Sequence, residues 1–166
     1  MAPAVRIRHL PPEKLQATCD AYDIMIEKLM KWSDNRPQPK GLSEEDVIAI
    51  SEYFKSNFNY SLPEGYTEFL EKMNGFSFDG YTIFCCLNDD VKENFPRRET
   101  SDLLYNNTNF RENTGITNYI LLGKSNISYI AYDLSTDKYV LMTDGDMRCL
   151  KEFDDFGSMI EGFMGL

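Results

Sequence analysis

Histidine and cysteine are scarce in this 166-residue chain. Its single histidine is His9, and its cysteines are Cys19, Cys85, Cys86 and Cys149. One histidine, in an N-terminal segment that we expect to be mobile, excludes a rigid His-based catalytic triad and a multi-histidine metal centre. No cysteine pair has the C-x-x-C spacing of a zinc or redox site, so we expect buried free thiols. Strand alternation would point the side chains of Cys85 and Cys86 to opposite faces, which disfavours a disulfide between them.

Phosphate-binding loops and long hydrophobic runs are also missing. Neither G-x-x-x-x-G-K-S/T nor G-x-G-x-x-G occurs, so the sequence offers no nucleotide-binding motif. No apolar run approaches the roughly 18 residues of a membrane span, and no signal-peptide core follows the basic residues near the N-terminus. We therefore expect a cytoplasmic protein without a cofactor and without a membrane partner.

Positive charge is in short supply. The chain has 17 Lys plus Arg against 27 Asp plus Glu, which gives a net charge of −10. Such a surface repels phosphate backbones, so we expect no direct contact with nucleic acid. A basic protein is the more natural partner, because opposite charge accelerates association. Acidity that only maintains solubility is the alternative explanation.

Aromatic residues, in contrast, are plentiful. With 11 Phe, 10 Tyr and 8 Met, the chain has enough apolar surface to pack a core without a metal or a disulfide. Its length is that of one domain. We expect a single domain over residues 1–166, with a core at about 43–164 and an N-terminal helix and connector over 1–42.

Three helices are predicted in the first half. Apolar residues at three- and four-residue steps predict a helix over about 13–32, with Leu15 and Cys19 in its stripe, and a polar connector with two prolines follows it. Ser43 is placed to cap a second helix at about 44–57, with Asp46 at its third position. The third helix follows Pro63, which is expected at its first position, and ends at Asn74 and Gly75, which tolerate a left-handed C-cap.

The second half changes to the period of strands. Residues 76–78 and 81–87 are predicted strands, and Asp89 and Asp90 end the second of them. Residues 88–115 are polar and predict a loop with one helix near 99–112. Four short strands at 119–123, 128–133, 138–142 and 147–151 have connections too short for parallel crossovers, so they form an antiparallel meander. Asp154 or Asp155 then caps a closing helix, and the fold class is α+β.

The acidic turn between the last two predicted strands has two interpretations. Asp144, Gly145 and Asp146 are typical of a hairpin turn, because Asp and Gly satisfy turn geometry unaided. Two carboxylates at this spacing also suit a divalent cation. The turn is the better-supported interpretation, and we expect no metal site.

The order of these parts resembles the SUKH superfamily, whose founding members are yeast cell-wall-synthesis regulators of the Smi and Knr type. The likeness extends over about 43–164. It includes an LP-x-x-[YF]-x-x-[FL]-L-x-x-x-N-G segment at 62–75, a later Leu-Leu-Gly strand and a strand with an (aromatic or aliphatic)-x-Asp pattern that ends at Asp133. The residues that match, and that we expect to determine the fold, are Leu62, Pro63, Tyr66, Phe69, Asn74, Gly75, Gly123 and Asp133.

The resemblance implies N-terminal helices packed on a mostly antiparallel curved sheet, with a C-terminal helix and no shared catalytic residues. It also implies a function, because bacterial members are typically cytoplasmic immunity proteins that bind and neutralise the toxin domain of a polymorphic or contact-dependent system. Such toxins are often nucleases with basic surfaces. We expect this chain to be a non-enzymatic immunity protein, either a monomer or a weak dimer, that contacts its toxin through the sheet face and neighbouring loops.

Loop acids and tyrosines are the candidate contact residues, the tyrosines because a tight interface is expected to bury an aromatic anchor. Each loop acid is also explained as solvated charge. The candidates are Asp79, Asp89, Asp90, Glu93, Asp144, Asp146, Tyr81, Tyr129 and Tyr139. The alternative function is that of a cytoplasmic regulatory adaptor of the yeast cell-wall-regulator kind, which would bind a signalling or scaffold protein. An enzyme is the third class, and the sequence lacks the nucleophile or metal site that it would need.

Overall fold

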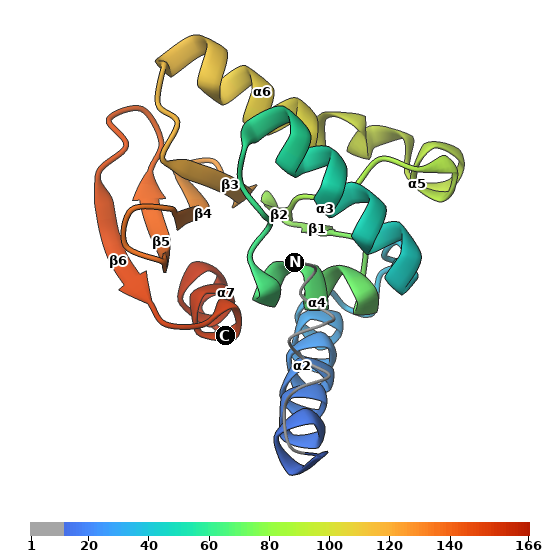
Figure 1. The fold of residues 1–166 in the computed structure, drawn as a ribbon. Coiled ribbons are helices and arrows are strands. Elements are labelled where there is room, and N and C mark those ends of the chain that lie inside the picture. The colour runs from blue at the N-terminus through green and yellow to red at the C-terminus, as the bar shows by residue number, and fades with distance from the viewer. Residues whose placement is uncertain (1–11) are drawn as a thin grey trace. The chain divides into compact units, whose positions relative to one another are not determined.

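The computed structural model describes residues 12–166, and it describes side chains from residue 21 onward (Figure 1). The chain divides into two compact units, residues 1–74 and residues 75–166. Each is described by itself below. The predictions for His9, Leu15 and Cys19 concern residues or side chains outside those described.

The first unit is helical. It contains α2 (Pro12–Trp32), α3 (Glu44–Phe58) and α4 (Glu64–Lys72), which confirms the three predicted helices. The Tyr22 hydroxyl donates to the Gly65 carbonyl at 3.1 Å, and Lys72 pairs with Asp23 at 3.0 Å. These polar contacts join α2 to α4, whose residues Tyr66, Phe69 and Leu70 are fully buried.

The predicted start of α3 is confirmed, whereas both ends of α4 differ from prediction. Ser43 accepts a hydrogen bond from the Asp46 N–H at 3.1 Å, as expected of a cap. Pro63 is the N-cap of α4 rather than its first helical residue. The predicted left-handed C-cap of α4 is wrong. The C-cap is Met73, which is extended (φ −154°) and forms an antiparallel bridge with Lys40.

The second unit is built on a six-stranded antiparallel sheet in the order β1-β2-β3-β4-β5-β6. Its strands are β1 (Phe76–Phe78), β2 (Tyr81–Ile83), β3 (Tyr119–Lys124), β4 (Ser128–Asp133), β5 (Lys138–Thr143) and β6 (Cys149–Phe153). The closing helix α7 (Phe156–Met164) is capped by Asp155, which accepts from the Ser158 N–H at 2.8 Å. The predicted meander and the α+β class are confirmed. β6 begins two residues later than predicted, after a turn in which Met147 has a φ of 54°.

The polar segment between β2 and β3 is more ordered than the sequence predicted. It holds α5 (Asp89–Asn94), the 3-10 helix η1 (Pro96–Ser101) and α6 (Leu103–Thr114). The helix predicted near 99–112 is present as α6, whereas the loop predicted before it is wrong, because α5 and η1 lie there. Asn88 caps α5 by accepting from the Val91 N–H at 2.9 Å. Asp89 and Asp90 therefore begin a helix, where the helix dipole favours acidic residues, and β2 ends earlier, at Ile83.

The two faces of the sheet carry different helices. On one face Tyr81 packs edge-on against Phe163 of α7, with ring centroids 5.1 Å apart, and Tyr139 packs against Phe156 at 5.9 Å. On the other face Tyr129 packs against Phe110 of α6 at 6.3 Å. The strand alternation of this part of the sequence thus separates an α7 face from an α6 face.

Two of the thiols are deeply buried, and one is not. Cys85 and Cys86 are buried and free, as predicted, whereas Cys149 is exposed on β6, contrary to prediction. Burial raises the pKa of the Cys85 thiol to about 11 and raises the pKa of Cys86 well above its ordinary value. Both therefore stay protonated and unreactive near neutral pH.

We expect iodoacetamide to distinguish these thiols in the native protein at about pH 8. Cys149 should be alkylated, while Cys85 and Cys86 should react only after denaturation, because burial keeps them protonated and inaccessible. Peptide mapping by mass spectrometry reads each cysteine separately, and the denatured protein is the control. Alkylation of native Cys85 as fast as Cys149 would contradict the burial described.

Gly123 lies in β3 where two neighbouring strands come close. A Cβ at this position would lie 2.4 Å from the Thr82 carbonyl oxygen and 2.9 Å from the Ile130 side chain. The Thr82 oxygen belongs to the backbone of β2, so it moves only if the sheet itself moves. Gly157 in α7 is a suitable comparison, because a Cβ there would approach the Asp155 carboxylate no closer than 3.4 Å.

Gly123→Ala should lower the free energy of unfolding by about 3 kcal/mol through overpacking. Gly157→Ala should change it by less than about 1 kcal/mol, since Ala favours helix. Urea denaturation monitored by circular dichroism gives both values. Equal stability of the two variants would show that β2 does not pack against Gly123 as described.

Candidate functional site

Three turns meet at one end of the sheet in the second unit. They are the turns at 79–80, 125–127 and 144–147, and together we call them the turn rim. Alternate hairpins of an antiparallel meander turn at the same end. The contacts agree: a Cβ on Gly80 would lie 3.5 Å from the Asn126 amide nitrogen, and the Asp144 N–H donates to the Ile127 carbonyl at 3.0 Å.

The turn rim combines an exposed apolar side chain with charge. Ile127 is 79% exposed, and Asp79, Asp144 and Asp146 around it are exposed acids. The Thr143 hydroxyl and the Arg148 N–H donate to Asp146 and lower the pKa of its carboxyl, so it remains ionised. Lys124 and Arg148 flank these turns and add positive charge.

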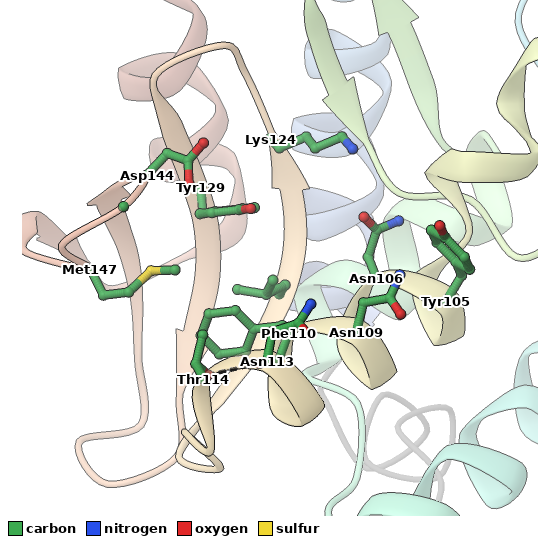
Figure 2. A pocket seen from close by; sticks show the side chains of 12 residues that line it. Tyr105, Asn106, Asn109, Phe110, Asn113, Thr114, Lys124, Tyr129, Asp144 and Met147 are labelled. Atoms are coloured by element: carbon green, nitrogen blue, oxygen red, sulfur yellow. Dashed lines mark hydrogen bonds between the residues drawn. The ribbon is translucent and has the colours of Figure 1, made fainter.

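A groove opens beside the turn rim, between α6 and the sheet (Figure 2). It has a volume of about 460 Å³. In Figure 2, Asn106, Asn109 and Phe110 project from α6, while Tyr129 reaches toward them from β4 and Met147 from the turn before β6. Its lining residues are Tyr105, Asn106, Asn109, Phe110, Asn113, Thr114, Leu121, Lys124, Tyr129, Asp144, Gly145 and Met147.

A buried asparagine holds α6 at this place. Asn107 is fully buried, and its side-chain amide pairs with the backbone of Leu121 in both directions. It accepts from the Leu121 N–H at 2.8 Å and donates to the Leu121 carbonyl at 3.0 Å. β2 pairs with β3 only at Lys124 and Gly123, so the Leu121 backbone lies beyond the end of β2. The Asn107 amide forms the hydrogen bonds that a neighbouring strand would otherwise make there.

Asp102 holds the start of the same helix. One of its oxygens accepts from the Leu87 N–H at 2.9 Å, and the other caps α6 by accepting from the Tyr105 N–H at 2.9 Å. The Cys85 backbone makes hydrogen bonds to the residues before and after Asp102. The Cys85 N–H donates to the Ser101 carbonyl at 3.0 Å, and the Leu103 N–H donates to the Cys85 carbonyl at 2.8 Å. One acidic side chain and one backbone bridge therefore join α6 to the end of β2.

The α6 wall of the groove presents amides to open space. Asn106 donates to the Thr100 and Asp102 carbonyls at 2.9 and 2.8 Å. The side chains of Asn109 and Asn113, which are half-buried and exposed, make no hydrogen bond within the part of the chain that the structure describes. Each amide offers both a donor and an acceptor.

The opposite side of the groove is partly apolar and partly acidic. Tyr129 of β4 lies edge-to-face with Phe110 of α6, and Leu121 of β3 lies beside them. Burial and the neighbouring Asp144 charge raise the pKa of the Tyr129 hydroxyl, so it stays protonated. A carboxylate close to a half-exposed aromatic ring is an arrangement that accommodates a basic side chain.

The structure brings together only some of the predicted contact residues. Tyr129 and Asp144 line the groove, and Asp79 and Asp146 lie on the turn rim with Asp144. Tyr81 and Tyr139 instead face α7, where Tyr139 is buried. Asp89, Asp90 and Glu93 lie on α5, which Figure 1 shows on the far side of the unit from β5 and β6.

The residues that carried the family resemblance lie outside the groove lining. Leu62, Pro63, Tyr66, Phe69 and Asn74 are buried in the first unit. The others belong to the second unit and lie at close approaches or turns. Gly75 has a φ of +84° and leaves no room for a Cβ beside Cys85, Gly123 lies against β2, and Asp133 accepts from the Ser135 N–H and hydroxyl at 2.9 and 2.6 Å.

Sequence reasoning missed the residues that shape the groove. They are Asn106, Asn107, Asn109 and Asn113, which lie in the polar segment 88–115 around its one predicted helix near 99–112, and none of them was a predicted site residue. A signal was present, because asparagine is a poor helix former and four of them recur within eight residues of one helix. Ile127 carried no signal, since an isolated apolar residue between two strands is ordinary.

The residues described offer neither a metal-binding cluster nor a membrane-spanning helix. No group of three or more His, Cys, Asp or Glu side chains there is arranged to hold a metal ion. Along the same stretch of chain, no helix is both long enough and apolar enough to cross a membrane.

Comparison with known proteins identifies one family. Residues 41–162 match the SMI1 / KNR4 family (SUKH-1), and this match covers most of the chain and extends into both units. A comparison with curated proteins found no match. The family match agrees with the helices, the antiparallel sheet and the closing helix described above, and the chain belongs to the SMI1 / KNR4 family (SUKH-1).

Proposed function

We propose that this protein is a non-enzymatic immunity protein that acts in the cytoplasm by binding the toxin domain of a polymorphic or contact-dependent system. Family membership supports a role in protein–protein interaction. We further propose that residues 1–166 act as one domain, since the family match extends into both units. The toxin assignment rests on the family resemblance together with the acidic charge of the chain.

The turn rim is the observation that carries the proposal. Ile127 stands 79% exposed among Asp79, Asp144 and Asp146, which is the arrangement of an apolar anchor within a polar border. The net charge of −10 favours a basic partner by steering its approach. A nuclease domain that binds nucleic acid has such a basic surface.

Co-expression tests the function directly. The toxin domain encoded by the neighbouring gene should arrest growth when expressed alone, and this protein should restore growth when expressed with it. If the cells still die although both proteins are made, the toxin assignment is wrong. The regulatory adaptor, which would bind a signalling or scaffold protein, then becomes the better explanation.

Charge changes on the turn rim should weaken binding of that toxin domain. The triple variant Asp79→Asn, Asp144→Asn, Asp146→Asn should bind at least about tenfold more weakly, chiefly through slower association at low salt. Ile127→Ala should lower the affinity for the toxin domain by about tenfold or more, because the shorter side chain buries less apolar surface in the partner. Surface plasmon resonance measures both rates.

The chain offers matched controls for both changes. Asp89→Asn, Asp90→Asn, Glu93→Gln removes the same amount of charge from α5, and Leu150→Ala truncates an exposed apolar residue on β6. These variants should bind as the wild type does. A toxin affinity that falls equally in the α5 variant would mean that only net charge matters, and the turn rim would lose its assigned role.

A further inference from the structure

We propose that the groove between α6 and the sheet binds an extended peptide segment that carries a basic side chain next to a large apolar one. The inference rests on the proposed function in one respect, because the natural source of the segment is the partner protein. Its chemistry follows from the groove itself. Three features support it: the spacing of the amides, the apolar floor and the position of Asp144.

The amides of α6 are spaced to follow an extended backbone. Asn109 and Asn113 are four residues apart, which places them on one side of the helix and about 6 Å apart along its axis. Alternate residues of an extended strand are about 6.6 Å apart. A strand lying along α6 can therefore exchange hydrogen bonds with both amides, each of which has a free donor and a free acceptor within the described part of the chain.

The floor and the end of the groove select side chains. Tyr129 and Met147, which are both half-buried, expose apolar surface for one side chain, and Phe110 and Leu121 lie buried beside them. Figure 2 shows the Asp144 carboxylate beside the Tyr129 side chain in the groove lining, and a carboxylate together with an aromatic ring suits an arginine or a lysine. Lys124 lies in the same groove, so the selected segment combines one basic residue with apolar neighbours rather than a run of basic residues.

The size of the groove agrees with a short segment. Its volume of about 460 Å³ lies within the range of sites that enclose small ligands. The span from Asn106 to Asn113 is about 10 Å along the helix, which corresponds to about three residues of an extended chain. The turn rim continues from Asp144, so one partner can contact both surfaces.

A library of blocked synthetic hexapeptides tests the inference without any toxin. Every position is varied among Arg, Glu, Leu and Gly, and the full-length protein is used to capture binders. The captured pool should be enriched in peptides that hold Arg next to Leu, relative to those with Glu or only Gly. A pool without enrichment, or one enriched in Glu, would overturn the proposal.

Two double variants of α6 then show whether the amides bind the backbone. The double variant Asn109→Ala, Asn113→Ala should bind the best peptide with about tenfold lower affinity, which is the loss expected for one or two hydrogen bonds. Thr108→Ala, Glu112→Ala has the same spacing on the exposed side of α6, away from the groove, and should bind as the wild type does. Fluorescence anisotropy with a labelled peptide gives the affinities, and equal affinities in both variants would contradict the amide role.

The outcomes separate this inference from the proposed function. Peptide capture with failed toxin rescue would leave the groove assignment in place and overturn the toxin assignment. Toxin rescue that depends on the turn rim, without any peptide enrichment, would leave the toxin assignment in place and overturn the groove assignment. Circular dichroism of each variant establishes that lost binding is not lost folding.

Discussion

The contact on which the candidate site depends is the pairing of the Asn107 amide with the Leu121 backbone. The buried Asn107 side chain makes two hydrogen bonds to the Leu121 backbone, one as donor and one as acceptor. These bonds fix α6 to β3, which matters because α6 is a polar helix with few buried apolar residues. With Asp102 at its start and Asn107 in its middle, α6 lies over one face of the sheet. The groove lies between that helix and the strands, so its shape depends on how α6 is fixed.

The sequence predicted those elements whose signals are local. α2, α3, α4 and α7 have apolar residues at helical spacing, and the strands from β3 to β6 are separated by turn residues at short intervals. The segment between β2 and β3 could not be predicted in the same way. Its order comes from Asp102 and Asn107 bonding to backbone that lies 14 or 15 residues away in the chain, and such contacts leave no periodicity.

Only the part of the candidate site that has local sequence signals was predicted. Tyr129 and Asp144 were candidate contact residues and belong to the predicted meander, and the structure brings both to the groove. The amides of Asn109 and Asn113 became visible only once α6 was known to be a helix facing the sheet. The proposed groove site thus lies where the local signals are weakest, whereas the motif at 62–75 forms α4 and contributes buried residues to the first unit.

Amide hydrogen exchange at Leu121 tests the central claim most directly. In the wild-type protein the Leu121 N–H should be strongly protected, because its acceptor is the buried Asn107 oxygen. In Asn107→Ala it should exchange at least about tenfold faster, while the N–H of Val140 in the middle of the sheet keeps its rate. A Leu121 rate unchanged by the substitution would contradict the account of how α6 is held and how the groove is formed.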